Sequence, residues 1–211
     1  MYDAIFFDLD GTLIDTERLA LNAGVGAFAA LGLTGAQEML HRMIGVDMPT
    51  AHKMLAAQYP GIDLAALDLH WSAAFDAATR DGIPLKSGAE SVLAALGERF
   101  ALGLVTSSGR EHAHVKLTQT GLAPAFRTVV TRDDVTMPKP APEAYLAAAR
   151  ALGADPARCL VFEDSEPGAQ AAWDAGMRVV QVPDVIPATG RFAHHIAADL
   201  TAGATWAGLW P

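Results

Sequence analysis

Four acidic side chains of this 211-residue chain stand directly after short apolar segments. Asp8 and Asp10 follow the apolar residues 5–7, and Glu163 and Asp164 follow a second apolar segment. Open α/β sheets bind ligands outside the carboxyl ends of their strands, so both pairs are expected at one edge. Four carboxylates at one place repel one another unless a cation lies among them. Oxygen ligands favour a hard ion, and Mg²⁺ fits best where a phosphate supplies further ligands.

Two further groups at predicted strand ends could hold that phosphate. Thr106, Ser107 and Gly109 follow the apolar residues 102–105. A hydroxyl and backbone amides at the start of a helix can donate hydrogen bonds to phosphate oxygens. Lys139 follows the third predicted strand, and its ammonium group would offset the charge of both a carboxylate and a phosphate.

Together these residue types would support the transfer of a phosphoryl group. Asp8 beside a metal ion could act as a nucleophile on phosphorus. Asp10 lies two residues further on, on the same side of an extended chain, and could protonate the leaving group and then activate water. Gly11 would let the backbone turn tightly toward the ligand. The residues themselves therefore predict a metal and phosphate site.

The elements that must position these groups alternate along the chain. Continuous rather than alternating apolarity indicates parallel strands covered on both faces. Strands are predicted at residues 5–7, 102–105, 128–130, 160–162 and 179–182, and helices at residues 90–96, 111–120, 142–152 and 167–175. The segment after Pro183 is expected to form a loop and a short final element. The pattern predicts an α/β fold with a doubly wound parallel sheet, a Rossmann-like core.

One long stretch breaks the alternation, because it carries helical patterns and no convincing strand. The predicted helices of this stretch cover residues 17–31, 36–44, 49–58 and 64–79. We therefore expect two domains: a catalytic core of residues 1–14 and 82–211, and an inserted helical cap of residues 15–81.

The composition limits the partners and the compartment. A net charge of -9 disfavours nucleic acid and anionic membranes as partners, because both require a basic face. The single cysteine, Cys159, cannot form an internal disulfide, which fits a reducing compartment. Neither a signal peptide nor an apolar run of about 18 residues is apparent. We expect a soluble, cytoplasmic monomer.

Four segments resemble the motifs of the haloacid dehalogenase superfamily, in the order that this family has. They are residues 7–13 (FDLDGTL), 106–108 (TSS), 139–143 (KPAPE) and 163–168 (EDSEPG). The helical insertion is similar to the small cap of the subfamily that includes β-phosphoglucomutase, phosphoglycolate phosphatase and many sugar-phosphate phosphatases. The resemblance implies a Mg²⁺-dependent phosphatase that hydrolyses a small phosphorylated metabolite through an aspartyl-phosphate.

The resemblance also implies roles for the acids. Asp8 would be the nucleophile and a metal ligand. Asp10 would be the general acid and base, with its backbone carbonyl on the metal. Asp164 would bind Mg²⁺ directly, and Glu163 would bind it directly or through water.

The remaining roles concern the substrate. Thr106 would bind the transferring phosphoryl group, assisted by the amides of Ser107 or Gly109, and Lys139 would hold both Asp8 and the phosphate. The cap of such enzymes contacts the rest of the substrate, which makes Arg42 a candidate for specificity, although an exposed helix charge is its more ordinary role.

Three alternatives to a phosphatase fit these residues less well. A phosphomutase like β-phosphoglucomutase has a histidine early in the cap and an arginine in a cap loop, whereas residues 16–20 contain no histidine and residues 44–49 contain no arginine. A 2-haloacid dehalogenase needs no Mg²⁺ and lacks the acid that Asp10 provides. A phosphate-binding protein without catalysis would not need all four acids. The substrate itself stays open among hexose phosphates, pentose phosphates, phosphoglycolate and nucleotides.

Overall fold

The computed structural model describes residues 2–43, 48–80 and 82–210. Proximity between Cα atoms divides the chain into two compact units, a core unit of Met1–Asp15 and Ile83–Pro211 and a helical unit of Thr16–Gly82. The predicted end of the second helix, Ile44, lies outside the described residues, as does the predicted domain limit Asp81.

The core unit contains one parallel sheet with the strand order β3-β2-β1-β4-β5-β6. Its described strands are β1 (Ala4–Phe7), β2 (Ala101–Val105), β3 (Thr128–Val130), β4 (Cys159–Glu163), β5 (Arg178–Gln181) and β6 (His195–Ile196). The predicted doubly wound parallel sheet is confirmed, with five strands at the expected places. β6 was not predicted, because two residues are too few to show a periodic pattern.

The central strands explain the continuous apolarity of their sequences. Every residue of β1 and β4 is buried. Ile5 and Phe7 belong to one hydrophobic cluster, whereas Ala4 and Phe6 belong to the cluster on the opposite face. The strand order reverses between β1 and β4, which is the point where open α/β sheets bind their ligands.

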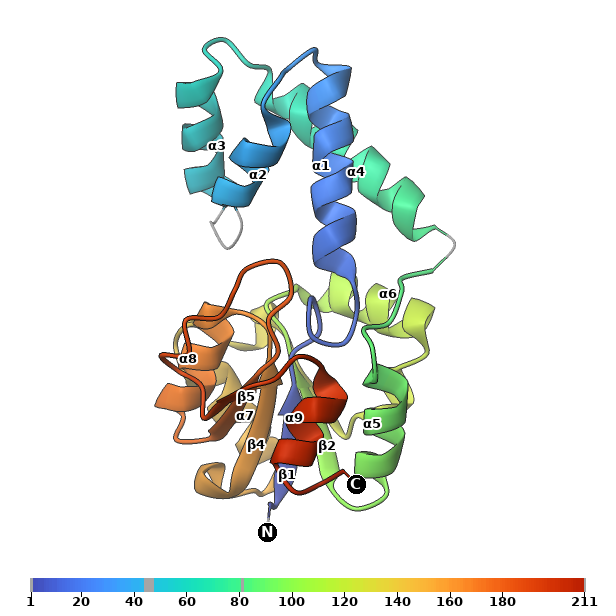
Figure 1. Cartoon of the computed structure of the whole chain (residues 1–211), viewed down its shortest axis with the longest axis vertical. Helices are drawn as coiled ribbons and strands as arrows, with labels where there is room; N and C mark the ends of the chain where they lie inside the picture. The colour runs from blue at the N-terminus through green and yellow to red at the C-terminus, as the bar shows by residue number, and fades with distance from the viewer. Residues whose placement is uncertain (1, 44–47, 81, 211) are drawn as a thin grey trace. The chain divides into compact units, whose positions relative to one another are not determined.

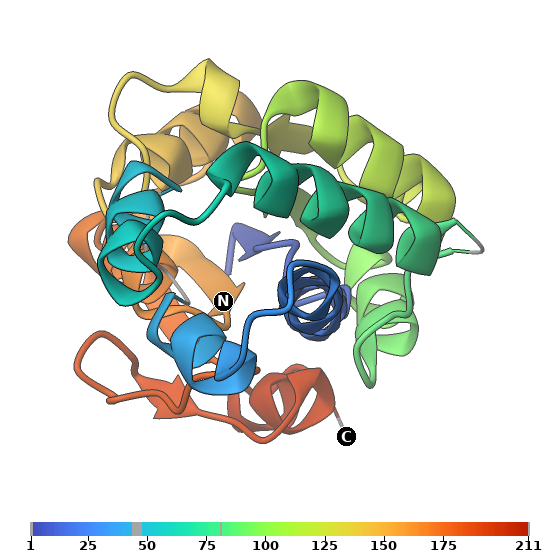
Figure 2. The same cartoon turned by 90° about the horizontal axis from the view of Figure 1, so that it is seen from above.

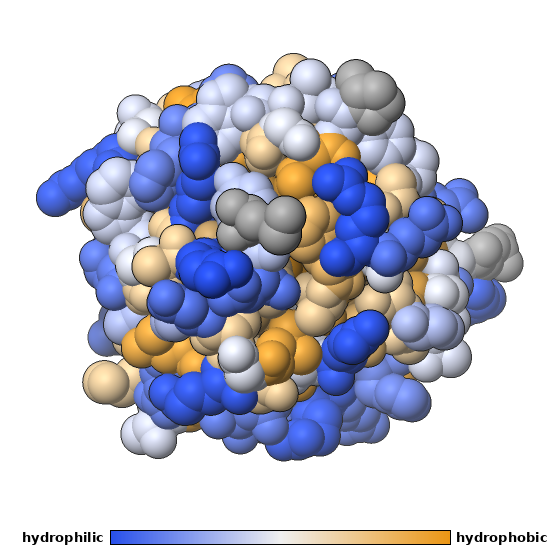
Figure 3. Space-filling view, turned by 90° about the horizontal axis from the view of Figure 1, so that it is seen from below, coloured by the Kyte–Doolittle hydropathy of each residue, from blue (hydrophilic) through white to orange (hydrophobic). Residues whose placement is uncertain are grey.

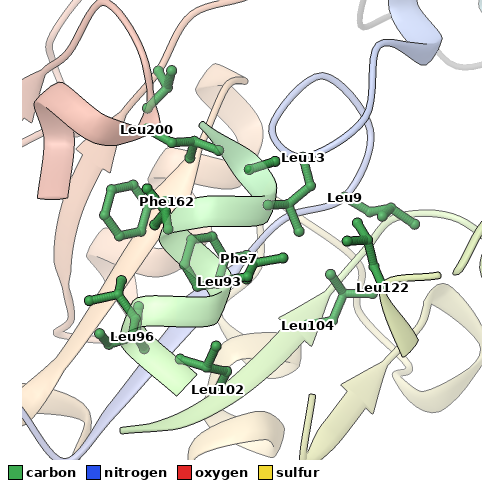
Figure 4. Packing of buried hydrophobic residues seen from close by; sticks show 14 of the residues in the cluster. Phe7, Leu9, Leu13, Leu93, Leu96, Leu102, Leu104, Leu122, Phe162 and Leu200 are labelled. Atoms are coloured by element: carbon green, nitrogen blue, oxygen red, sulfur yellow. The ribbon is translucent and has the colours of Figure 1, made fainter. Parts of the chain in front are cut away.

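One face of the sheet packs against α5 (Ala89–Gly97), α6 (Arg110–Thr120) and α9 (Leu200–Trp206). Figure 4 shows this packing, with Leu93 and Leu96 of α5 close to the sheet residues Phe7 and Phe162. The rings of Phe7 and Phe162 are stacked, with centroids 5.0 Å apart. This contact ties β1 to β4 directly below the ends that carry the acids.

The other face is covered by α7 (Glu143–Leu152) and α8 (Glu166–Asp174), on the opposite side from α5 and α9 (Figure 1). Most of the helix residues buried there are alanines, so the backbones approach the sheet closely. The fully buried Tyr145 is the one large side chain among those that α7 and α8 bury, within the described residues. The described connections also contain short 3-10 helices, η1 (Ala123–Ala125), η2 (Arg132–Asp134) and η3 (Pro156–Arg158).

The helical unit consists of α1 (Thr16–Ala30), α2 (Ala36–Met43), α3 (Met48–Gln58) and α4 (Leu64–Thr79), as expected from the sequence. Figure 2 looks along α1 and shows α4 crossing beside it. Phe28, Leu40, Leu55 and Leu67 form the buried centre of this unit. The indole nitrogen of Trp71 donates to the carbonyl of Ala20 at 2.9 Å, which joins α4 to α1.

Figure 3 views the side on which the N-terminus of β1 lies, and there hydrophobic areas alternate with hydrophilic ones. The acids follow the opposite, carboxyl ends of the strands. None of the described helices has the length and the apolar character that crossing a membrane requires.

Candidate active site

The candidate active site is built where β1, β2 and β4 end, side by side. Phe7 is in register with Leu104 of β2 and Phe162 of β4, so the residues that follow these three strands lie at the same edge of the sheet. The amide of Asp8 donates to the carbonyl of Phe162 at 3.0 Å, which extends the ladder past the end of β1. The sheet therefore fixes the backbone of Asp8 before any side chain contributes.

Three of the four predicted acids form one group. Asp8, Glu163 and Asp164 each offer a carboxylate oxygen, and these oxygens all lie within 4.8 Å of one another. Within the described ranges, the carboxylate of Asp10 is not part of this group. When all three acids are ionised, the single positive charge of Lys139 leaves two negative charges in excess. The donor set and its charge therefore fit a hard divalent cation.

Lys139 connects two of these acids, as the sequence predicted for Asp8. Its ammonium donates to Asp8 Oδ1 at 2.8 Å, to Glu163 Oε1 at 2.5 Å and to the carbonyl of Val105 at 2.9 Å. Burial alone would lower the pKa of Lys139, but the two adjacent carboxylates outweigh burial and raise that pKa above its ordinary value. Lys139 is therefore a fixed positive charge beneath the acids.

Asp8 has the opposite electrostatic balance. Burial raises the pKa of the Asp8 carboxyl, Lys139 lowers it, and Glu163 raises it again, so that the pKa is about 8. The Asp8 carboxylate is therefore short of compensating positive charge when only Lys139 is beside it. A second cation at this place would relieve that shortage.

Glu163 is completely buried, and both of its oxygens are held by the protein. Besides Lys139, the hydroxyl of Tyr145 donates to Oε1 at 2.9 Å, while the hydroxyl of Ser165 donates to Oε2 at 3.0 Å. Ser165 also caps α8, because its Oγ accepts from the amide of Gly168. Tyr145 was not predicted, since nothing in its local pattern distinguishes it from other buried helix residues.

Asp164 is held from the turn that follows β1. The hydroxyl of Thr12 donates to Asp164 Oδ1 at 3.2 Å. Gly11 has a φ of 81°, as a tight turn requires, and a Cβ atom there would lie 2.3 Å from Asp164 Oδ2. The predicted turn at Gly11 is confirmed, and its glycine is needed chiefly because Asp164 approaches the backbone so closely.

The predicted phosphate-binding groups follow β2 at the same edge. Thr106 is buried, and its Oγ1 accepts a hydrogen bond from the amide of Ser108 at 3.0 Å. The hydroxyl hydrogen of Thr106 can still be donated, because a hydroxyl group accepts and donates at the same time. Ser107 is exposed, and Gly109 is the N-cap of α6. This arrangement gives the edge a hydroxyl and the amino end of an 11-residue helix.

Asp10 has partners that the sequence did not reveal. Lys116, in the second half of α6, donates to Asp10 Oδ1 at 2.6 Å, and the hydroxyl of Ser108 donates to Oδ2 at 2.8 Å. Lys116 lies 106 residues from Asp10 in the chain, and no motif marks it. Only the packing of α6 against the sheet brings the two together.

Arg42 lies in the last turn of α2, in the helical unit, and is exposed. It is not among the residues that the core unit brings together. Its predicted role in substrate recognition stays a prediction.

Comparison with known proteins adds three findings. A sequence model of the haloacid dehalogenase-like hydrolases matches residues 5–182, a range that contains all four acids. The fructose-1-phosphate phosphatase of Escherichia coli is 33% identical over 186 residues, covering 86% of this chain and 96% of that protein. The validoxylamine A 7'-phosphate phosphatase of Streptomyces hygroscopicus subsp. limoneus is 33% identical over 178 residues, or 84% of each chain.

A solved structure agrees with these sequences. A HAD family hydrolase of Deinococcus radiodurans R1, with bound phosphate and sodium, superimposes with a TM-score of 0.81 and 30% identity. The match covers 99% of this chain and 97% of the other.

Proposed function

This chain belongs to the haloacid dehalogenase-like hydrolases and is a phosphoric monoester hydrolase, and we propose that it cleaves a small phosphorylated metabolite through an aspartyl-phosphate on Asp8. The observation that supports this mechanism best is the group of Asp8, Glu163 and Asp164 above the buried ammonium of Lys139. A nucleophilic carboxylate, a cation site and a fixed positive charge are thereby within a few ångströms of one another.

In the proposed first step, a carboxylate oxygen of Asp8 forms a bond to phosphorus while the bond from phosphorus to the leaving oxygen breaks. Asp10 gives its proton to that oxygen, so the product leaves as an alcohol. In the second step, Asp10 takes a proton from water as the water oxygen bonds to phosphorus. The bond between phosphorus and Asp8 breaks, which releases inorganic phosphate and restores the carboxylate.

We propose Mg²⁺ as the cofactor. Asp8, Asp164 and Glu163 would hold it, together with the backbone carbonyl of Asp10. When bound, it would offset the charge of the phosphate and of the acids. Lys139 keeps one oxygen of Asp8 in place, and Thr106 with the amides of Ser107 and Gly109 would hold the phosphoryl oxygens.

The choice of substrate is assigned to the helical unit. All of the groups proposed for the chemistry belong to the core unit, whereas the helical unit offers Arg42 as a candidate contact. Two relatives are named for hydroxyl-rich phosphate esters, which supports a sugar phosphate or a similar small ester. The proposal also includes that the protein acts in the cytoplasm as a monomer and binds neither nucleic acid nor membranes.

The experiment is to measure inorganic phosphate release from hexose phosphates, pentose phosphates, phosphoglycolate and nucleotides, with Mg²⁺ and with a chelator. The proposal expects Mg²⁺-dependent release from one or a few compounds. Release that the chelator leaves unchanged would contradict the cofactor. A requirement for a bisphosphate activator, without net phosphate release, would favour the phosphomutase instead.

A further inference from the structure

We propose that Lys116 and Ser108 position the carboxyl group of Asp10 for proton transfer to the leaving group, an inference that rests on the proposed function. The three residues come from three segments: the turn after β1, the loop after β2 and the middle of α6. None of the four family-like motifs contains Lys116.

The three side chains form a closed triangle of hydrogen bonds. Lys116 Nζ donates to Asp10 Oδ1 at 2.6 Å and to Ser108 Oγ at 3.0 Å, and Ser108 Oγ donates to Asp10 Oδ2 at 2.8 Å. An aspartate side chain has two torsion angles. Partners on both of its oxygens therefore fix the direction of the carboxyl group and the rotation of its plane.

The two partners are themselves anchored. The amide of Ser108 donates to Thr106 Oγ1 at 3.0 Å, and the carbonyl of Ser108 accepts from the amide of Arg132 at 3.0 Å. Lys116 precedes Leu117, which is buried in the core together with Ala113 of the same helix. The orientation of Asp10 is thus coupled to the sheet, to α6 and to the threonine proposed to hold the phosphoryl group.

The side chains of this triangle are less exposed to solvent than those of an ordinary surface ion pair. The side chains of Lys116 and Asp10 are only 16% and 23% exposed, so each is held among protein atoms rather than in bulk water. A proton transfer in the transition state requires the donor within hydrogen-bond reach of the leaving oxygen, and small misplacements of a catalytic group are costly. A positioning role for Lys116 and Ser108 meets this requirement.

The test compares Lys116→Met with wild type on two kinds of ester. An alkyl phosphate that the enzyme hydrolyses needs its leaving oxygen protonated, whereas p-nitrophenyl phosphate releases a stable phenolate that does not. We expect kcat/KM to fall about 100-fold with the alkyl phosphate and less than about 5-fold with p-nitrophenyl phosphate. Lys116→Arg should recover much of the loss, and Ser108→Ala should show the same dependence on the leaving group more weakly. Gln119→Met, an exposed position on the same helix, is the matched control and should match wild type.

Equal losses with both esters, or no loss with either, would overturn the proposal. A wild type that releases phosphate from no ester would contradict the proposed function rather than the triangle. For that case, a crystal structure of Lys116→Met gives a readout without activity. The carboxyl group of Asp10 should then leave its present orientation, and an unchanged orientation would overturn the positioning role.

Discussion

Lys139 lies between Asp8 and Glu163, and its side chain is 5% exposed. Within the described part of the chain, it is the only lysine that forms an ion pair with either acid. Buried carboxylates without a compensating cation are strongly destabilising. The identity of this one residue therefore affects both folding and chemistry.

Lys139→Met should lower the free energy of unfolding by about 3–5 kcal/mol, because Glu163 stays buried without its cationic partner. Urea unfolding of the metal-free protein measures this change, and turnover should be lost as well. Lys53→Met, at an exposed position of α3, is the control and should change stability by less than about 0.5 kcal/mol. A loss below about 1 kcal/mol for Lys139→Met would contradict the charge balance described for the site.

The affinity for Mg²⁺ should depend on pH through Asp8. Burial, opposed by Lys139 and reinforced by Glu163, raises the pKa of Asp8 to about 8, so below that pH a proton occupies the carboxylate that the metal needs. The rise in Tm caused by Mg²⁺ should therefore be smaller at about pH 6 than at about pH 9. In Asp8→Asn this pH dependence should largely disappear. The same Mg²⁺ effect at both pH values in the wild type would argue against a protonated Asp8.

The residue types with a direct chemical role stand out in the sequence, and their supporting partners do not. Asp8, Thr106 and Lys139 follow predicted strands, so the edge of the sheet gathers them. Tyr145 and Lys116 lie inside helices, and their contacts depend on how those helices rotate against the sheet. That rotation is set by packing over the whole core, which no local pattern encodes.

Among the elements, α8 is positioned by an unusually close approach to Glu163. A Cβ atom on Gly168 would lie 1.9 Å from Glu163 Oε1, while Ser165 caps the same helix and donates to Glu163. The first turn of α8 and the acid before it therefore form one packed unit.

Gly168→Ala should lower stability by about 1–3 kcal/mol and weaken Mg²⁺ binding, because either α8 or Glu163 must shift. Gly26→Ala, an exposed glycine in α1 whose added Cβ meets no atom within 4 Å, is the matched control. Alanine there should stabilise the protein by up to about 1 kcal/mol. Thermal unfolding with and without Mg²⁺ measures both, and a neutral Gly168→Ala would show that the close contact is relaxed in solution.

Most elements are predictable because their patterns are local. The helices predicted at residues 111–120 and 142–152 end where expected, and Gly121 and Gly153 follow them as left-handed C-caps, with φ of 69° and 63°. β6 is different, because His195 and Ile196 form a two-residue edge strand that is not fully buried. Its existence depends on pairing with β5 rather than on its own sequence.

For the whole molecule, the chain leaves and re-enters the core unit at one place. The amide of Asp15 donates to the carbonyl of Pro84 at 2.9 Å, and Ile14 bridges Leu85 in antiparallel fashion. The helical unit is thus an insertion whose two connections are held together by the core unit itself.

A core unit in which a short glycine-serine linker joins Asp15 to Ile83 should therefore fold alone. We expect cooperative thermal unfolding and Mg²⁺-dependent hydrolysis of p-nitrophenyl phosphate, because the acids and Lys139 are all retained. Selectivity among natural phosphate esters should fall, since the helical unit is proposed to provide it. Unchanged selectivity would refute that assignment, and failure of the shortened chain to unfold cooperatively would show that the core unit depends on the insertion.

The central claim is that Asp8 carries the phosphoryl group during turnover. The most direct measurement is to quench the enzyme with acid while it turns over its best substrate with Mg²⁺, reduce it with borohydride, and sequence the peptides by mass spectrometry. Borohydride converts an aspartyl-phosphate to homoserine, so we predict homoserine at position 8, dependent on both substrate and Mg²⁺ and absent from Asp8→Asn. Phosphate release without any conversion at position 8, or conversion at another aspartate, would contradict the mechanism.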